Sequence, residues 1–253
     1  MAFDNTGAIA TGLAIANLEN VARSVTVVIR DADGNLLLTT TLSLAARGHT
    51  SLMLADAYPV TAGQRGTVEF QTPTGGRISV LGLRANGPAL TTLPVLANVG
   101  TDGGSIAHAL FNGGFTNSFT LVNTGMAPAP ATLSFYDESG AALTTPVFLP
   151  QTSEFVTAAA VTRDLAPGAS LVIESVGDEN LPVVVGSASL TTTGNVGGFS
   201  IFRWTQFGQE ASVPLEDRIP GSFVLVFDNT SGLTTGLAMA NAANTGASIM
   251  VRI

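Results

Sequence analysis

A segment near the start of the sequence is repeated near its end. The stretch FDNTGAIATGLAIAN (residues 3–17) is matched by FDNTSGLTTGLAMAN (residues 227–241), and about half of the positions aligned from there onward are identical. The two stretches lie 224 residues apart, which leaves room for further units between them. Repeated units constrain the fold strongly, because each copy must form the same supersecondary structure and pack in the same way.

A fainter copy lies between these two stretches. At a shift of 106 residues, Asn17 aligns with Asn123, and TVVIRDADG (residues 26–34) aligns with TLSFYDESG (residues 132–140). Further along, at a shift of 104, GTVEF (residues 66–70) aligns with SLVIE (residues 170–174), which we interpret as a two-residue loop deletion. The repeat unit is therefore predicted to be about 110 residues long, with two unlike units in each longer period.

Each unit has the pattern of short β-strands. Apolar residues alternate with small or polar residues in segments rich in Val, Ile, Leu and Thr, and RDADGN and YDESGA have the composition of hairpin turns. No segment keeps a helical period for three turns. In the first unit the predicted strands are residues 11–18, 24–31, 35–44, 49–55, 66–72, 77–84 and 89–97. Seven short strands per unit predict an all-β fold of tandem immunoglobulin-like antiparallel β-sandwiches.

Three domains follow from the repeat. We expect a first sandwich over 1–101 that lacks its first strand, because SFVLVFDN (residues 222–229) is present at the front only as MAFDN. A second sandwich is expected over 104–217, and 220–253 is expected to supply the opening strands of a third. Residues 99–105 and 215–222 carry the Gly, Pro and charge typical of linkers. The sequence is thus interpreted as a window within a longer array.

Composition limits which partners the protein can bind and indicates the compartment in which it works. Only 11% of residues are charged, the net charge is −8 and there is no Lys, whereas nucleic-acid binding needs a basic face. No apolar run is long enough to insert into a membrane as a spanning helix. The absence of Cys, together with few charges and abundant Thr, Gly and Asn, favours an extracellular or cell-surface protein.

Several sequence segments resemble those of a known group of proteins. GRISVLGLR, TTLPVLA, IAHALFNGGFTNSFTLVNTG, LSFYDESGAAL, VGGFSIFRW and GQEASVPLEDR are similar to the tandem β-sandwich repeats of large secreted bacterial proteins, familiar from Acidobacteria and relatives, which have no assigned activity. The resemblance extends over essentially the whole chain. It implies export, a long array and a role outside the cell, and it implies no catalytic residue.

The sequence offers little for catalysis. With no Cys and no Lys, only His49 and His108 could activate a nucleophile, and the region of the second unit that corresponds to His49 has no His. No nucleophile elbow, phosphate loop or zinc spacing is present. We therefore expect a protein that is not an enzyme and uses no cofactor.

One turn could hold a metal ion. Asp31, Asp33 and Asn35 place side-chain oxygens close together in DADGN, which is a weak pattern for calcium. The simpler interpretation is that a hairpin turn favours Asp, Asn and Gly for its own backbone. The second unit has Asp137, Glu138 and Ser139 at this place, so the oxygen spacing is not kept.

One aromatic cluster stands out in a chain with a single Trp. Phe202, Arg203, Trp204 and Phe207 lie in FSIFRWTQF, which the alignment of the units treats as an insertion in the second unit. Core packing or a contact between units is the first interpretation, and a sugar-binding platform is the alternative.

The leading functional hypothesis is therefore a structural protein. Sandwiches with low charge and few residues that protect strand edges favour contacts between units, so we expect an extracellular fibre, stalk or filament built by head-to-tail contacts with other copies. The strands within 220–253 are expected to pair with a neighbouring copy. The alternative is a cell-surface adhesin, or a module that binds a glycan or a protein.

Overall fold

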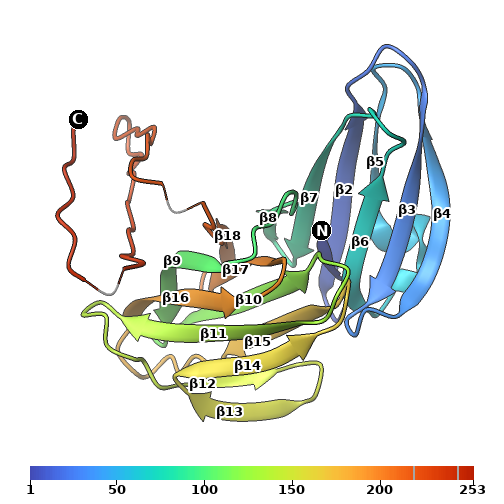
Figure 1. Ribbon diagram of the computed structural model, residues 1–253. Helices are drawn as coiled ribbons and strands as arrows, with labels where there is room; N and C mark the ends of the chain where they lie inside the picture. The colour runs from blue at the N-terminus through green and yellow to red at the C-terminus, as the bar shows by residue number, and fades with distance from the viewer. Residues whose placement is uncertain (219, 244) are drawn as a thin grey trace.

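The structure is a computed structural model, which describes residues 1–218, 220–243 and 245–253. Figure 1 shows two β-sandwiches joined at a seam, with the C-terminal residues running apart from both. The sandwiches are built from four antiparallel sheets, so the all-β sandwich prediction is confirmed. Within the described residues, no helix has the length and apolar character that crossing a membrane requires.

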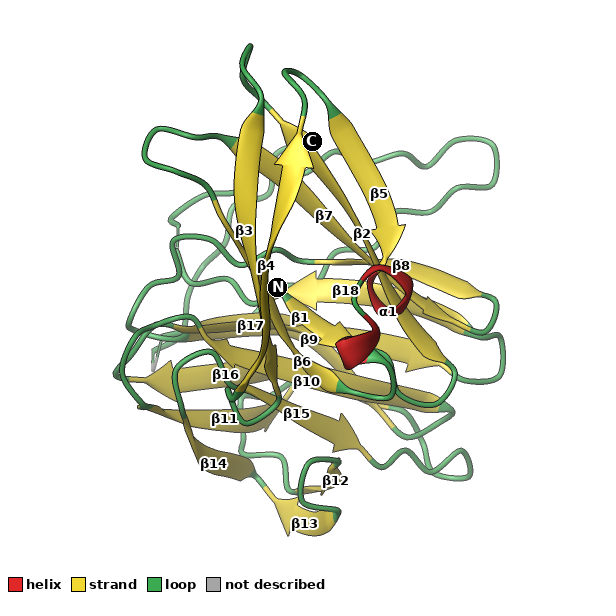
Figure 2. Ribbon diagram, turned by 90° about the vertical axis from the view of Figure 1, so that its right-hand side faces the viewer, coloured by secondary structure: helices red, strands yellow, loops and turns green. Residues whose placement is uncertain are grey.

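The first sandwich consists of β1 to β8. One sheet has the strand order β1-β6-β3-β4 and the other has β5-β2-β7-β8. One helical turn and one 3-10 turn join β5 to β6, and Figure 2 shows the short helix in red. The bounds are β1 (Ala2–Asp4), β2 (Ile9–Asn17), β3 (Arg23–Asp31), β4 (Leu36–Leu44), β5 (His49–Met53), α1 (Leu54–Ala57), η1 (Pro59–Thr61), β6 (Arg65–Gln71), β7 (Ile78–Asn86) and β8 (Ala89–Leu93).

The second sandwich consists of β9 to β18. Its four-stranded sheet has the order β14-β11-β16-β9, and its six-stranded sheet has the order β13-β12-β15-β10-β17-β18. The bounds are β9 (Gly104–Phe111), β10 (Phe115–Asn123), β11 (Ala129–Asp137), β12 (Thr145–Leu149), β13 (Glu154–Ala158), β14 (Ala160–Leu165), β15 (Ser170–Ser175), β16 (Val184–Thr192), β17 (Val196–Trp204) and β18 (Gln209–Pro214).

The two sandwiches share one strand order. Replacing β1 to β8 by β9, β10, β11, β14, β15, β16, β17 and β18 converts the sheets of the first sandwich into those of the second, and the β12–β13 hairpin is the addition. The central pairs β2–β5, β3–β6 and β3–β4 match the B–E, C–F and C–C′ pairs of an immunoglobulin sandwich. The edges differ from that pattern, because β1 lies beside β6 and β7 lies beside β2.

The topology corrects two details of the sequence alignment. The match of residues 66–70 with 170–174 is wrong, because the former lie in β6, beside β3, and the latter in β15, beside β10. The counterpart of β6 is β16. Gly66 lies opposite Asp31 as Gly186 lies opposite Asp137, and a Cβ on either glycine would collide with a carbonyl oxygen, of Arg30 or Tyr136.

The second correction concerns the aromatic stretch. FSIFRW is not an insertion, because it belongs to β17, the counterpart of β7. The added segment is the β12–β13 hairpin. It raises the shift between the sandwiches from 106 at Asn17 and Asn123 to 120 at Gly66 and Gly186.

Equivalent side chains make equivalent hydrogen bonds at the end of β2 and β10. Asn17 Nδ2 donates to the carbonyls of Val21 and Ala45 at 2.8 and 2.9 Å. Asn123 Nδ2 donates to the carbonyls of Ala127 and Leu165 at the same two distances. Both asparagines are buried, so each satisfies two carbonyls that water does not reach.

Each sandwich has its own apolar core between its sheets. Leu13, Ile15, Val27 and Ile29 lie at the centre of the first core. Phe119, Phe135 and several Leu and Ile residues fill the second, where the Phe119 and Phe135 rings are 5.4 Å apart. Alternate residues of each strand supply these cores, as the period of two predicts.

The described residues of the tail, from 220 onward, form no strand. Every large apolar side chain among them is more than half exposed: Phe223, Val224, Leu225, Val226, Phe227, Leu233, Leu237, Met239, Ile249, Met250, Val251 and Ile253.

Local hydrogen bonds of the first sandwich nevertheless recur in the tail, between residues 224 positions later. In the first sandwich the opening turn joins Thr6 N and Oγ1 to Asp4 Oδ1, Asp4 N to Thr11 Oγ1, Thr11 Oγ1 to Asp4 O, and Thr11 N to Asn5 Oδ1. The same five bonds join Asp228, Asn229, Thr230 and Thr235. The tail thus keeps the turn chemistry of a first unit without its sheets.

Candidate functional site

The seam between the sandwiches has an apolar centre. Ala2 and Leu93 of the first sandwich pack against Val122, Phe199 and Ile201 on the outer face of the six-stranded sheet, and all five side chains are buried. Leu96, in the segment between β8 and β9, packs against the same cluster. Burial of this kind fixes the two sandwiches relative to each other, because separating them would expose the cluster to water.

A buried carboxylate lies beside this centre. The side chain of Glu210 on β18 is 0% exposed and forms an ion pair with Arg203 at 3.0 Å. Across the seam, Asn86 Nδ2 donates to Glu210 Oε1 at 2.7 Å, and Arg84 Nε lies 3.3 Å from Glu210 Oε2 without hydrogen-bond geometry. Two guanidinium groups therefore compensate one carboxylate that has lost its water.

A second charged contact lies at the other side of the seam. Arg65 Nε donates to Asp4 Oδ2 at 2.8 Å, and Arg65 Nη2 lies 3.8 Å from Glu174 Oε1 on β15. Burial raises the pKa of Glu174, and the nearby Arg65 partly offsets this by favouring the charged form.

Two hydrogen bonds that involve the backbone also cross the seam. Ser170 N donates to the Ala32 carbonyl at 2.9 Å, and Thr67 Oγ1 donates to the Gly168 carbonyl at 2.7 Å. Bonds at fixed backbone positions set the register of one sandwich on the other, which apolar packing alone would leave free to slide.

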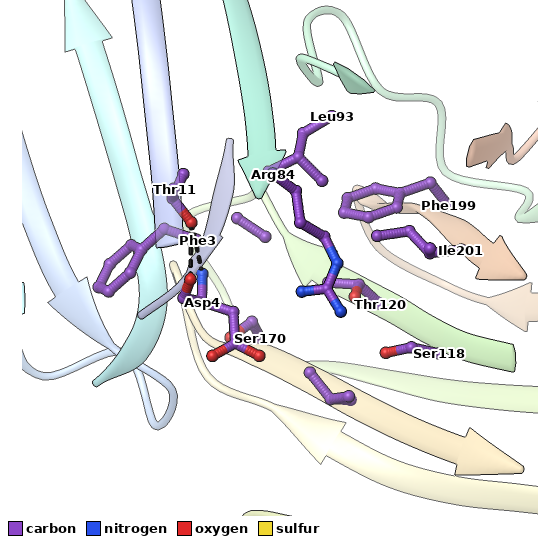
Figure 3. A pocket seen from close by; sticks show the side chains of 12 residues that line it. Phe3, Asp4, Thr11, Arg84, Leu93, Ser118, Thr120, Ser170, Phe199 and Ile201 are labelled. Carbon is purple, nitrogen blue, oxygen red and sulfur yellow. Dashed lines mark hydrogen bonds between the residues drawn. The ribbon is translucent and has the colours of Figure 1, made fainter. Parts of the chain in front are cut away.

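A small pocket remains within the seam. Its volume is about 30 Å³, close to the space that one water molecule occupies, so it has no room for an organic ligand. Figure 3 shows Arg84 reaching from β7 towards β10, the strand that carries Thr120 and Ser118, with Phe199 and Ile201 beside it. The pocket is a feature of packing between the sandwiches.

The aromatic stretch predicted as a contact or ligand site is divided between two faces. Arg203 lies on the outer face of β17 and belongs to the seam. Its neighbours point the other way, as adjacent residues of a strand must. Phe202 makes an edge-to-face contact with His108 at 5.4 Å, and Trp204 stacks on Phe115 at 5.3 Å.

The end of this cluster is open to solvent. Phe207, in the turn between β17 and β18, is 60% exposed and lies 4.3 Å from the Trp204 ring. Phe115 was missed in the sequence. It lies opposite Trp204 in the β10–β17 register, and correct pairing of those strands would have identified it. The cluster forms a ledge of three rings at one end of the second sandwich.

The turn considered for calcium uses its oxygens internally. Asp31 Oδ1 accepts from Asp33 N at 3.0 Å and from Asn35 N at 2.8 Å, and Asp31 Oδ2 accepts from Asn35 Nδ2 at 3.0 Å. In the second sandwich, Asp137 Oδ1 accepts the two corresponding backbone hydrogen bonds, from Ser139 N and Ala141 N. Within the described ranges, no group of three or more His, Cys, Asp or Glu residues could hold a metal ion.

The two histidines lie on different sandwiches. His49 is exposed at the start of β5, whereas His108 is half-buried on β9 against Phe202. Burial lowers the pKa of His108. His49 and His108 therefore do not belong to one site.

Comparisons with known proteins add no functional information. No family model and no curated protein matches the chain. A solved structure titled "Crystal structure of PBSX exported protein XepA" is similar at 10% sequence identity over 76% of this chain and 81% of that one, with a TM-score of 0.21. Similarity at that level carries no argument about fold or function. The resemblance to secreted bacterial repeats stays a prediction.

Proposed function

We propose that the chain is a non-enzymatic structural repeat protein of the cell exterior, in which β-sandwiches join head to tail into a fibre, stalk or filament. The observation that carries the proposal is the tail. It repeats the opening turn of the first sandwich bond for bond, while its apolar side chains have no sheet to cover them. Strands as apolar as these are stable only within a larger sheet.

Asn241 illustrates what the tail lacks. Its Nδ2 donates to the Thr245 carbonyl at 2.7 Å, as Asn17 does to Val21. Among the described residues, the second carbonyl that Asn17 and Asn123 each bind has no equivalent for Asn241. In the proposed assembly a neighbouring copy provides the missing sheet.

The first sandwich has a place for an added strand. β1 pairs with β6 from Arg65 to Thr67, and Met1 exchanges two backbone hydrogen bonds with Val68, although β6 continues to Gln71. In the second sandwich the counterpart β9 is eight residues long and pairs with β16 as far as Leu190. We infer that residues 220–226 of one chain lie beside this uncovered part of β6 in the next chain. Such a contact is heterologous and propagates as a filament when it does not close into a ring.

Electron microscopy and light scattering of the full chain test the proposal. The expected result is filaments with an axial repeat of two sandwiches. Val224→Pro should prevent assembly because it removes a backbone N–H from the pairing strand, whereas Val224→Thr keeps the N–H and should assemble. A chain that remains monomeric at all concentrations, or a proline variant that assembles like the threonine variant, would contradict the proposal.

The exposed aromatic ledge supports a second candidate function, a glycan-binding or protein-binding adhesin. Aromatic rings open to solvent are suitable platforms for sugar stacking, and Phe207 extends the Trp204 surface. Because Trp204 is the only Trp in the chain, its fluorescence would report binding directly. Saturable fluorescence changes with one sugar, lost in Phe207→Ala, would favour the adhesin over the fibre.

A further inference from the structure

The face of the second sandwich that is buried in the seam has an open counterpart on the first. The registers of β10 with β17 and of β2 with β7 match position by position. The seam residues Ser118, Thr120, Phe199 and Ile201 correspond in this way to Gly12, Ala14, Leu81 and Leu83. The sheet β5-β2-β7-β8 therefore presents outward the face that is structurally equivalent to the one by which the second sandwich holds the first.

This open surface is an apolar groove. It has a volume of about 350 Å³ and is lined by Ala10, Gly12, Leu13, Ser51, Leu52, Met53, Leu83, Ala85 and Leu90. Leu90 is 68% exposed, Leu81 44% and Met53 41%. Contiguous apolar surface of this kind marks an interaction site more often than scattered single residues do. We call it the outer groove.

The end of the first sandwich that enters the seam also has a counterpart. Ala2, Arg65, Arg84 and Leu93 correspond to His108, Val185, Phe202 and Val213, by the strand registers within each sandwich. These four residues lie on β9, β16, β17 and β18, and the His108 and Phe202 rings among them are 5.4 Å apart. We call this set the free end.

Where the seam has pairs of opposite charge, the outer groove and the free end have apolar residues at both positions of each pair. In the seam, Arg84 meets Glu210 and Arg65 meets Glu174. The counterparts of Arg84 and Glu210 are Phe202 and Leu90. Those of Arg65 and Glu174 are Val185 and Met53. Both partners of each pair have changed from charged to apolar. A change in one partner alone would leave a charge facing an apolar side chain, which is costly in a buried contact.

The remaining positions are also compatible with contact. Leu93 and Phe199 pack in the same seam cluster, and their counterparts are Val213 and Leu81.

At the rim, Ala32 and Gly168 take part in hydrogen bonds across the seam. Their counterparts are Glu138 and Arg47, both exposed and of opposite charge. A rim of complementary charge around an apolar centre is the usual arrangement of a protein interface.

We propose that the outer groove of one copy of this chain binds the free end of another copy, in the geometry by which the second sandwich binds the first. The inference rests on the proposed function and specifies which surfaces of the folded sandwiches join. It is independent of strand pairing by the tail. Groove and end are different surfaces, so the contact is heterologous and each copy can join two others.

Charge substitutions that reproduce the seam pairs test this contact. Leu90→Glu places the Glu210 carboxylate in the groove, and Phe202→Arg places the Arg84 guanidinium at the free end. Each single variant of the full chain should associate with itself at least about tenfold more weakly than wild type in sedimentation velocity, because it leaves a charge against an apolar partner. The double variant should recover association, because it recreates the pair.

Mixing provides a second readout. An equimolar mixture of the Leu90→Glu and Phe202→Arg chains should recover association. The intact free end of the first chain fits the intact groove of the second, and the two substituted surfaces recreate the ion pair. Met53→Glu and Val185→Arg should behave in the same way, which covers the case in which Phe202→Arg disturbs the second sandwich. Met126→Glu is the matched control. Met126 is 98% exposed in a loop outside both surfaces, so this variant should associate like wild type.

The outcomes separate this contact from the fibre itself. Filaments that form normally in all the groove and free-end variants would overturn the outer groove and leave the proposed fibre intact. A wild-type chain that is monomeric at every concentration would overturn both. Single variants that weaken association without recovery in the mixture, or a control that weakens it equally, would also contradict the contact.

Discussion

Arg84 of the first sandwich and Glu210 of the second face each other across the seam, with Nε and Oε2 3.3 Å apart. Arg84 is 11% exposed and the Glu210 side chain is 0% exposed, so the pair is almost free of water. Arg203 and Asn86 bind the other carboxylate oxygen. This one glutamate therefore links residues of both sandwiches at the edge of the apolar seam.

Replacing Glu210 by Ala should loosen the seam. Arg84 and Arg203 would remain without their carboxylate, and breaking a buried pair in this way costs about 3 kcal/mol. Chemical denaturation should show a lower free energy of unfolding and separate transitions for the two sandwiches. Glu154→Ala is the control, because its pair with Arg163 is exposed and should contribute less than about 1 kcal/mol. Equal losses in the two variants would argue against a special role for Glu210.

The three equivalent asparagines should respond differently to substitution. Asn17→Ala and Asn123→Ala each leave two carbonyls unsatisfied, so each should lower the free energy of unfolding by about 2 kcal/mol. Asn241→Ala should leave the melting temperature of the unassembled chain unchanged, because its surroundings are exposed. If Asn241→Ala also left filament formation unchanged, the proposed ordering of the tail on assembly would be wrong.

The alignment of the two sandwiches was most accurate where polar side chains bind the backbone. Asn17 and Asn123 align at one shift and make the same bonds, because a buried amide between two carbonyls tolerates few replacements. The alignment failed beyond the β12–β13 hairpin. Strands of both sheets there share the same alternation of apolar and polar residues, so residues 66–70 matched a strand of the wrong sheet.

The seam could not have been located from the sequence. Glu210 is a charged residue between Gln209 and Ala211 in a hairpin strand, a position typical of a solvent-facing side chain. It is buried only because the other sandwich covers it. Arg203 and Trp204 are adjacent in the sequence, and only the pairing of β17 with β10 shows that one faces the seam and the other faces Phe115.

Calcium should not stabilise the protein. The Asp31 carboxylate already accepts three hydrogen bonds within its own turn, and a ligand raises stability only when it binds the native state more tightly than the unfolded chain. Melting temperatures in EDTA and in millimolar calcium should therefore agree. A rise of several degrees in calcium that disappears in Asp31→Asn with Asp33→Asn would establish a site in this turn.

His108 should make stability depend on pH near neutrality. Burial lowers its pKa in the folded protein from the ordinary value of 6.5, so the unfolded chain binds more protons between these two pKa values. The contribution is fully present above about pH 6.5 and is lost as the pH falls through the folded pKa. Comparing the free energy of unfolding of wild type and His108→Gln across this window isolates the effect, because both chains keep every carboxylate. The difference should shift in favour of the variant as the solution is acidified, and parallel curves would show that the folded protein accommodates the His108 charge as readily as water does.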